Sequence, residues 1–390
     1  MMPRYPHVLE PLRLAGGLEL RNRLFFASMG VDLADHSGCV TPAMIEFYQG
    51  IMEGGCAMAF LCNATVSPQS RLQSTGLGLF EQHQGESLKA MFAMAEQVNT
   101  PVGVQLQHYG GQGTTTHTGV AVLTPSGVPC PRVSKLDPDY RVRIMDESDI
   151  ALVIEQFAHS AWLAWTNGAR LVQLQASNGY LLSSFLSPHT NKRTDRYGGS
   201  EENRARLLLD VVRAIRERTQ GQLIVTIRLG IDDRLGAEGL QYPDLKETVQ
   251  TLCQAGVAAL ECSMCMGATF GQLIVHSETM DQYLQAGVRA IKSVSTVPVG
   301  YSGFINGLDK AEQLLADGVC DWVGMSRALF ADNDLINKTL QGRSADIHKC
   351  RWDSQCFSDK SNPRLDRVYC CVNPKNIKFW SFLWFLRNVW

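Results

Sequence analysis

Residues 223–263 read LIVTIRLGIDDRLGAEGLQYPDLKETVQTLCQAGVAALECS, and this stretch contains the pattern that decides the fold. It begins with an apolar, β-branched run at 223–229, which is typical of a buried strand. Pro243 and Gly256 then bound a segment whose apolar residues recur at helical spacing, and a second apolar run follows at 258–263. Because a helix between two buried apolar strands is the pattern of a β-α-β unit, the stretch predicts two neighbouring parallel strands.

The same alternation recurs along the chain. Short apolar segments rich in β-formers are each followed by a longer stretch of helical periodicity, one of which is expected to form a helix over 204–218. Eight such units predict an α/β fold, a (β/α)8 TIM barrel. The expected strands lie at 23–29, 57–62, 102–107, 171–175, 223–229, 258–263, 297–301 and 320–325.

Two segments are longer than a strand-helix connection needs. Residues 110–146 are rich in Gly, Thr, Pro and Ser, and residues 181–200 are polar and turn-rich. Both follow expected strands, so in a barrel they would lie at the C-terminal mouth and form walls or lids of an active site. We expect residues 1–345 to form the barrel and residues 346–390 to form a C-terminal tail.

The bulk composition excludes several classes of protein. The chain has 390 residues, of which 45% are hydrophobic and 19% charged, so it can bury a large core, and disorder is not expected. A net charge of -2 with no basic stripe argues against nucleic-acid binding. The apolar runs are too short to span a membrane, and the 12 cysteines are scattered. We therefore expect a soluble, cytoplasmic protein that acts on a small molecule.

A phosphate site is expected where the last two strands end. The seventh strand leads into Ser302 and Gly303, and the eighth leads into Gly324, Ser326 and Arg327. Glycines let backbone N–H groups approach an anion, and an arginine supplies positive charge. In TIM barrels the loops after these two strands frequently bind phosphate, which favours this interpretation over a simple turn.

The loop at 178–200 carries a long and specific motif, NGYLLSSFLSPHTNKRTDRYGGS, followed by EENR. It closely resembles the loop after strand four in the Old Yellow Enzyme family, which includes dienoyl-CoA reductase-like enzymes. The resemblance implies an FMN-binding barrel over about residues 5–345 and an ene-reductase-like activity with NADH or NADPH as reductant. Matching pieces occur in the same order at 22–29, 105–108, 124–129, 228, 302–303 and 324–327.

The resemblance assigns residues to the flavin. Gln105 and Arg228 match the family residues that hydrogen-bond the pyrimidine end of FMN, where a fixed positive charge would stabilise the reduced, anionic flavin. An ion pair of Arg228 with Asp232 or Asp233 is the structural alternative. The segment Ala27, Ser28, Met29 and Gly30 is also expected to contact the cofactor.

The resemblance also assigns residues to the substrate. Tyr180 matches the tyrosine that protonates one substrate carbon while hydride from flavin N5 attacks the other, although it could simply fill the base of the loop. Gln175 stands where relatives usually have histidine, so Gln175 and Asn178 could hold an activating oxygen only through neutral amide N–H groups. His108 could line the pocket or be a structural histidine.

Two further departures and the tail leave other functions open. Gly30 and Gly111 replace residues that contact flavin or substrate in many relatives, so the flavin potential could differ. The tail resembles a [4Fe–4S] segment, but Asp353 occupies a usual cysteine position, so we interpret it as a degenerate remnant. Its cysteines are Cys350, Cys356, Cys370 and Cys371.

The aromatic end of the chain, residues 379–390, could pack on the barrel or enter a homo-oligomer contact. The leading functional hypothesis is NAD(P)H-dependent reduction of an activated C=C bond of the enone or enoyl-thioester type. Amine oxidation, redox-neutral double-bond isomerisation and non-catalytic flavin binding are the alternatives. The physiological substrate and the choice between NADH and NADPH are not encoded in any motif that we can interpret.

Overall fold

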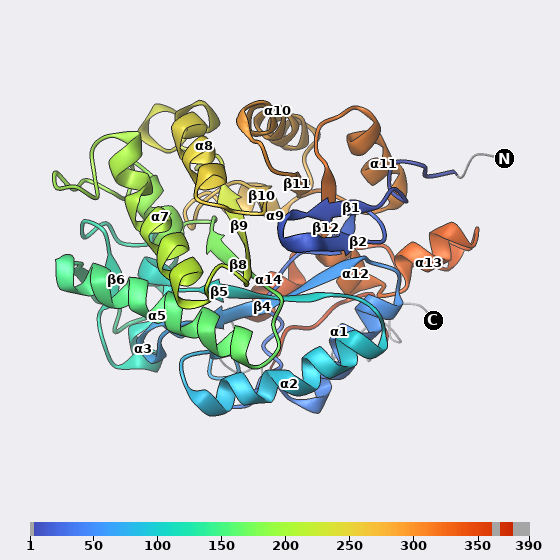
Figure 1. Ribbon diagram of the computed structural model, residues 1–390, viewed down its shortest axis with the longest axis horizontal. Coiled ribbons are helices and arrows are strands. Elements are labelled where there is room, and N and C mark those ends of the chain that lie inside the picture. The colour runs from blue at the N-terminus through green and yellow to red at the C-terminus, as the bar shows by residue number, and fades with distance from the viewer. Residues whose placement is uncertain (1–3, 361–366, 377–390) are drawn as a thin grey trace.

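The computed structural model describes residues 4–360 and 367–376. Within these residues, eight parallel strands close into a barrel in the order β10-β11-β12-β3-β4-β5-β8-β9 (Figure 1). Every strand that the sequence predicts is present, and the TIM-barrel prediction is confirmed. The barrel strands are β3 (Leu24–Phe26), β4 (Met58–Thr65), β5 (Val102–Gln107), β8 (Leu171–Ala176), β9 (Ile224–Gly230), β10 (Ala259–Ser263), β11 (Val299–Ser302) and β12 (Trp322–Met325).

Helices on the outside of the barrel connect these strands (Figure 1). Their apolar faces pack on the outward-facing strand residues, as the periodicity predicts. The long helices are α1 (Pro42–Glu53), α2 (Gln82–Gln97), α5 (Glu147–Thr166), α7 (Glu201–Arg218), α8 (Lys246–Gln254), α10 (Glu278–Val294) and α11 (Leu308–Ala316). Short helices α12 (Arg327–Ala331) and α13 (Leu335–Leu340) follow the last strand.

Capping explains where α7 begins. The sequence predicts this helix from Arg204, but it starts three residues earlier, at Glu201. Ser200 is its N-cap, because the Ser200 hydroxyl accepts a hydrogen bond from the backbone N–H of Asn203 at 3.2 Å. Two acidic residues in the first turn and two arginines in the last turn complement the helix dipole.

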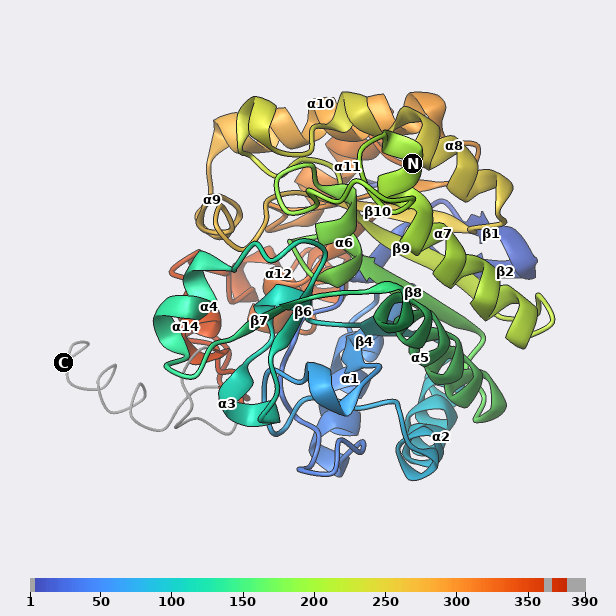
Figure 2. The same ribbon diagram turned by 90° about the vertical axis from the view of Figure 1, so that its left-hand side faces the viewer.

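A short hairpin that the sequence analysis did not predict closes the N-terminal end of the barrel. It consists of β1 (Leu12–Leu14), the 3-10 turn η1 (Ala15–Gly17) and β2 (Leu18–Leu20). The leucines of both strands are buried in a cluster with Phe25, Phe60 and Trp322 from the barrel interior. In Figure 2 this hairpin and α14 lie at opposite ends of the molecule, so the hairpin leaves the mouth free.

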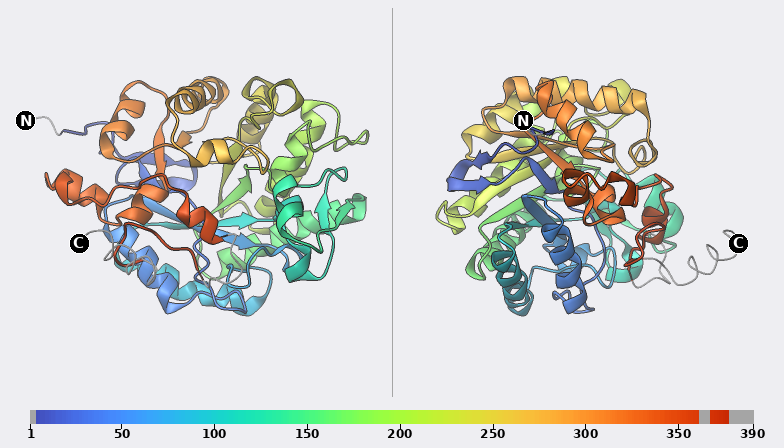
Figure 3. Two further views of the ribbon diagram at one scale, coloured as in Figure 1. Left: turned by 180° about the vertical axis from the view of Figure 1, so that it is seen from behind. Right: turned by 90° about the vertical axis from the view of Figure 1, so that its right-hand side faces the viewer.

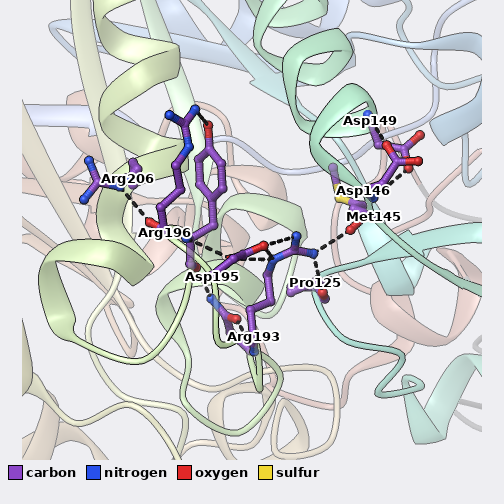
Figure 4. A network of polar contacts seen from close by, with 10 residues as sticks. Pro125, Met145, Asp146, Asp149, Arg193, Asp195, Arg196 and Arg206 are labelled. Atoms are coloured by element: carbon purple, nitrogen blue, oxygen red, sulfur yellow. Dashed lines mark hydrogen bonds and ion pairs between the residues drawn. The ribbon is translucent and has the colours of Figure 1, made fainter.

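The two long segments form structured walls at the mouth. The first contains α3 (Thr115–Thr118), β6 (Val122–Thr124), α4 (Pro131–Leu136) and β7 (Val142–Ile144), and the second contains α6 (Leu181–Leu186). Arg193 joins them, because its guanidinium donates to the carbonyl oxygens of Pro125, at 2.9 Å, and Met145 while it pairs with Asp195 (Figure 4). The Arg193 hydrogen bond lowers the pKa of Asp195. The walls are therefore held by an arginine whose side chain is only 10% exposed, and not by sheet contacts alone.

Short elements complete the connections, and the chain then returns over the barrel (Figure 3). The buried Asn373 donates to the carbonyl of Phe330 at 2.7 Å, which anchors residues 367–376 against α12. Residues 379–390 lie outside the described residues. No helix in the described ranges is long and apolar enough to cross a membrane. The short elements are η2 (Pro68–Ser70), η3 (Gly110–Gln112), η4 (Gly236–Glu238), η5 (Tyr242–Leu245), α9 (Gly271–Ile274), η6 (Ser344–Asp346) and α14 (Gln355–Lys360).

Candidate active site

A pocket opens where the carboxyl ends of the barrel strands meet. Most residues that the sequence singles out lie on its wall, and they come from five segments that are distant in the chain. Three of the predicted residues, Ala27, Gln105 and His108, are buried outside this lining. Those on the wall are Ser28, Met29, Gly30, Gln175, Asn178, Tyr180, Arg228, Ser302, Gly303, Gly324, Ser326 and Arg327.

Below the pocket, four polar side chains form a buried row across the barrel interior. Gln105 donates to the amide oxygen of Gln173 at 2.7 Å, and Gln173 donates to a carboxylate oxygen of Glu261 at 2.9 Å. The other oxygen of Glu261 lies 3.2 Å from Nε of Arg228. Gln105 and Gln173 are register partners on neighbouring strands β5 and β8, and Arg228 and Glu261 are register partners on neighbouring strands β9 and β10. Side chains at such paired positions face the same side of the barrel wall, which here is the interior.

The ion pair of Arg228 differs from the alternative that the sequence suggests. Its acidic partner is the fully buried Glu261, whereas Asp232 accepts from the Tyr283 hydroxyl at 2.7 Å and Asp233 accepts from Ser187. Arg228 also donates to the carbonyl oxygen of Ser28 at 3.0 Å. The guanidinium is therefore held at the pocket wall from two sides, with its charge balanced from below.

At the other end of the pocket, Arg327 is held by backbone and an aromatic ring. Its guanidinium donates to the carbonyl oxygens of Leu273, at 3.2 Å, and Ile274, and it lies 4.3 Å from the ring centroid of Trp352. Burial lowers the pKa of Arg327, although a guanidinium stays charged at neutral pH. Beside it, the hydroxyl of Ser302 is buried without a partner among the described residues.

Tyr180 lies at the base of the second long segment, as the N-terminal flanking residue of α6. Its ring packs edge-to-face on Tyr109, with centroids 5.5 Å apart. Burial lowers the pKa of the Arg132 guanidinium, on α4, and the nearby phenol of Tyr180 partly offsets this shift. The phenol is thus positioned by aromatic packing and lies near a positive charge.

Gln175 and Asn178 are linked through the hydroxyl of Ser177. Ser177 Oγ lies 2.6 Å from Oε1 of Gln175 and 2.7 Å from Oδ1 of Asn178. The amide nitrogen of Asn178 donates to the carbonyl oxygen of Met264 at 2.9 Å and lies 3.3 Å from the hydroxyl of Ser263. Both N–H groups of Asn178 are therefore engaged within the protein. Gln175 lines the pocket, and one end of its amide has no hydrogen-bond partner among the described residues.

The remaining predicted residues support the site from outside. His108 is buried, and its Nδ1 accepts the backbone N–H of Gly110 at 3.1 Å. Burial lowers the pKa of His108 to about 3, so its ring is neutral at physiological pH. Ala27 is fully buried in the barrel interior, and its carbonyl oxygen accepts from the Ser326 hydroxyl at 3.1 Å.

The tail supplies a wall that the sequence analysis did not foresee. Trp352, Cys356 and Phe357 line the pocket together with residues of α9. Phe357 packs on Phe270 at 5.1 Å and on the guanidinium of Arg132 at 4.0 Å. No hydrophobic periodicity marks this segment, and its aromatic residues are the only signal that could have indicated packing.

The tail cysteines do not form a cluster site in the described residues, where no three His, Cys or acidic side chains are placed to hold a metal ion. Cys371 instead donates to the carboxylate of Asp353 at 2.7 Å. Burial raises the pKa of Cys356 to about 11 and that of Cys371 to about 12. An iron–sulfur cluster needs its ligand side chains gathered around one point, and the described residues hold no such group.

The family model for NADH:flavin oxidoreductases and NADH oxidases matches residues 7–346. The chain belongs to this family. Membership confirms the resemblance of the 178–200 loop and identifies FMN as the cofactor for which the barrel is built.

Individual family members agree with this assignment. The chain is 29% identical to an NADH oxidase of Thermoanaerobacter brockii over 96% of its own length and 56% of that protein. It is 31% identical to a metal reductase of Desulforamulus reducens over 92% of its own length and 52% of that protein. A 2-naphthoyl-CoA reductase structure superposes with a TM-score of 0.86, at 24% identity, over 95% of this chain and 57% of that one. The chain thus spans little more than half the length of these relatives.

The pocket fits the flavin of this family on structural grounds. At the pocket wall, the buried hydroxyl of Ser302 has no partner among the described residues, as expected where a polar group is to be bound. Gly324 has no room for a side chain, because a Cβ there would collide with Ser302 Oγ. By their chemistry, Arg228 is suited to the ring system, and Ser302, Gly303 and Arg327 are suited to the phosphate, whereas Gln105 is buried below the pocket wall.

Proposed function

We propose that this protein is an FMN-dependent oxidoreductase that uses NADH or NADPH to reduce an activated carbon–carbon double bond of the enone or enoyl-thioester type. The observation that carries the proposal is the convergence of Tyr180, Gln175 and Arg228 on one pocket at the barrel mouth. FMN, when bound there, would supply hydride from its N5 position.

The protein's own residues would then orient and protonate the substrate. Tyr180 would donate its phenolic proton to one carbon of the double bond, and the phenolate would regain a proton from solvent. The edge-to-face contact with Tyr109 limits the orientations of the Tyr180 ring. A positioned proton donor is worth about 100- to 10,000-fold in rate, which is large enough to measure.

Arg228 would act through its charge at the pyrimidine end of the site. It is fixed by Glu261 and by the Ser28 carbonyl, so it cannot swing away when the charge of the site changes. The tail would exclude water, because Trp352 and Phe357 cover one side of the pocket. A water-poor pocket strengthens each electrostatic contact within it.

The experiment uses the variant Tyr180→Phe to separate the two half-reactions, which are reduction of the flavin by the nicotinamide and its reoxidation by the alkene. Flavin absorbance is followed anaerobically, first on adding NADH or NADPH and then on adding 2-cyclohexenone or crotonyl-CoA. We expect bleaching by the nicotinamide at a nearly unchanged rate and recovery by the alkene about 100-fold slower than in the wild type. Tyr242→Phe, outside the pocket, is the matched control.

Two results would contradict the proposal. Flavin that NADH and NADPH both leave oxidised would exclude it, and so would reduced flavin that neither alkene reoxidises in the wild type. Double-bond migration without stoichiometric consumption of the nicotinamide would identify an isomerase instead.

A further inference from the structure

The hydroxyl of Ser177 lies between two amides but has only one proton. Its Oγ is 2.6 Å from the atom placed as Oε1 of Gln175 and 2.7 Å from the atom placed as Oδ1 of Asn178. Both distances are those of real hydrogen bonds, so one neighbour must accept the proton of Ser177 and the other must donate to its lone pair. The orientation of one amide is therefore determined by the other.

Asn178 decides which neighbour accepts. One end of its amide lies 2.9 Å from the carbonyl oxygen of Met264, and a carbonyl can only accept a hydrogen bond. That end must be the NH2 group, because two carbonyl oxygens at this distance would repel each other. The oxygen of Asn178 therefore faces Ser177 and takes its proton.

We infer that the Gln175 amide is turned over relative to this placement, so that Gln175 donates its N–H to Ser177 and presents its Oε1, a hydrogen-bond acceptor, to the pocket. The oxygen and nitrogen of a glutamine amide have nearly the same shape, so the hydrogen-bond network determines which one faces which neighbour. Ser177 and Asn178 are both buried, and this low-dielectric setting makes a mismatched contact costly. Arg228 is the register partner of Gln175 on β9, so the two side chains face the same side of the barrel wall, and both line the pocket.

An acceptor at this position selects a class of substrate. Resting on the proposed function, the inference is that the preferred enone-type substrate also carries an N–H beside its carbonyl group, as in an unsaturated lactam. Such an N–H donates to Gln175, whereas a substrate without it leaves this buried acceptor unpaired and binds more weakly.

The test compares two lactams that differ only in whether the ring nitrogen carries a hydrogen or a methyl group. The FMN-loaded protein is titrated with 5,6-dihydropyridin-2(1H)-one and with its N-methyl derivative, and binding is followed by the change in flavin absorbance. We expect the N–H lactam to bind about tenfold more tightly, equivalent to about 1.4 kcal/mol. Equal or tighter binding of the N-methyl lactam would overturn the inference.

Variants distinguish orientation from simple steric exclusion of the methyl group. Ser177 is fully buried and does not line the pocket, so Ser177→Ala frees the Gln175 amide without enlarging the pocket wall. The binding ratio should fall towards one in Ser177→Ala, remain in Ser177→Thr and remain in Gln175→Glu, which offers only acceptors. A ratio that is unchanged in Ser177→Ala would exclude the amide orientation as its cause.

The proposed function can fail separately. If the N–H lactam binds preferentially and the preference depends on Ser177, but neither lactam nor enone reoxidises the reduced flavin, then the inference about Gln175 stands and ene reduction does not.

Discussion

Two regions of this protein surround the same pocket but are held in place by different forces. The polar row below the pocket, Gln105, Gln173, Glu261 and Arg228, is carried by neighbouring strands, and three of its members are fully buried. The tail wall, Trp352 to Phe357, is half-buried and rests on ring and cation–π contacts. Strand register therefore positions the row, whereas a few weak contacts position the wall.

The difference shows which parts of the site tolerate change. A charge in the row that loses its partner has little access to water, so the loss should affect the stability of the whole fold. A contact in the wall can be replaced by solvent at small cost, so its loss should affect binding more than stability. Substitutions of Glu261 and Trp352 test this contrast directly, and a substitution of the buried His108 extends it to a neutral polar side chain.

The largest effect is expected for Glu261→Ala. The substitution removes the carboxylate partner of Arg228, whose side chain is only 12% exposed. It also removes the group that accepts the hydrogen bond from Gln173. We expect a loss of about 3–5 kcal/mol in the free energy of unfolding, measured by urea titration. Glu10→Ala, which breaks the exposed Arg23–Glu10 pair, is the control and should cost less than about 1 kcal/mol. Similar losses for both variants would remove the contrast.

His108, at the end of β5, should make stability depend on pH. Its folded pKa of about 3 lies below the value of an unfolded histidine, so the unfolded chain binds the proton preferentially. The neutral ring therefore costs no stability above about pH 6.5. As the pH falls from there towards about 3, the free energy of unfolding decreases, by about 2 kcal/mol at pH 5. Unfolding of His108→Gln should show a flatter slope between pH 7 and 5. The exposed His36→Gln should retain the wild-type slope.

The smallest effect is expected for Trp352→Ala in the tail wall. Without the ring 4.3 Å from the guanidinium, Arg327 is less well oriented towards the pocket. We expect the Kd for FMN, measured by flavin fluorescence, to rise about fivefold, equivalent to about 1 kcal/mol, with almost no change in unfolding. Trp352→Phe should restore most of the affinity. A loss of stability as large as that of Glu261→Ala would show that the tail is part of the core.

The sequence was sufficient for the barrel because buried parallel strands form apolar runs and their covering helices have a different period. It did not identify the β1–β2 hairpin, whose strands have three residues each and are too short for a periodic pattern. Glu261 was overlooked for a related reason: a single carboxylate inside an apolar run has no neighbour in the chain that indicates its partner.

The sequence by itself determined the barrel, the family and which residue types meet at its mouth, because these depend on local periodicity and on a contiguous motif. Only the tertiary structure decided the partners: Glu261 rather than Asp232 or Asp233 for Arg228, the Met264 carbonyl for Asn178, and Trp352 for Arg327. Hydrogen bonds and ion pairs act over about 3 Å, and residues far apart in the chain reach that distance only after strand register and loop packing have set their positions.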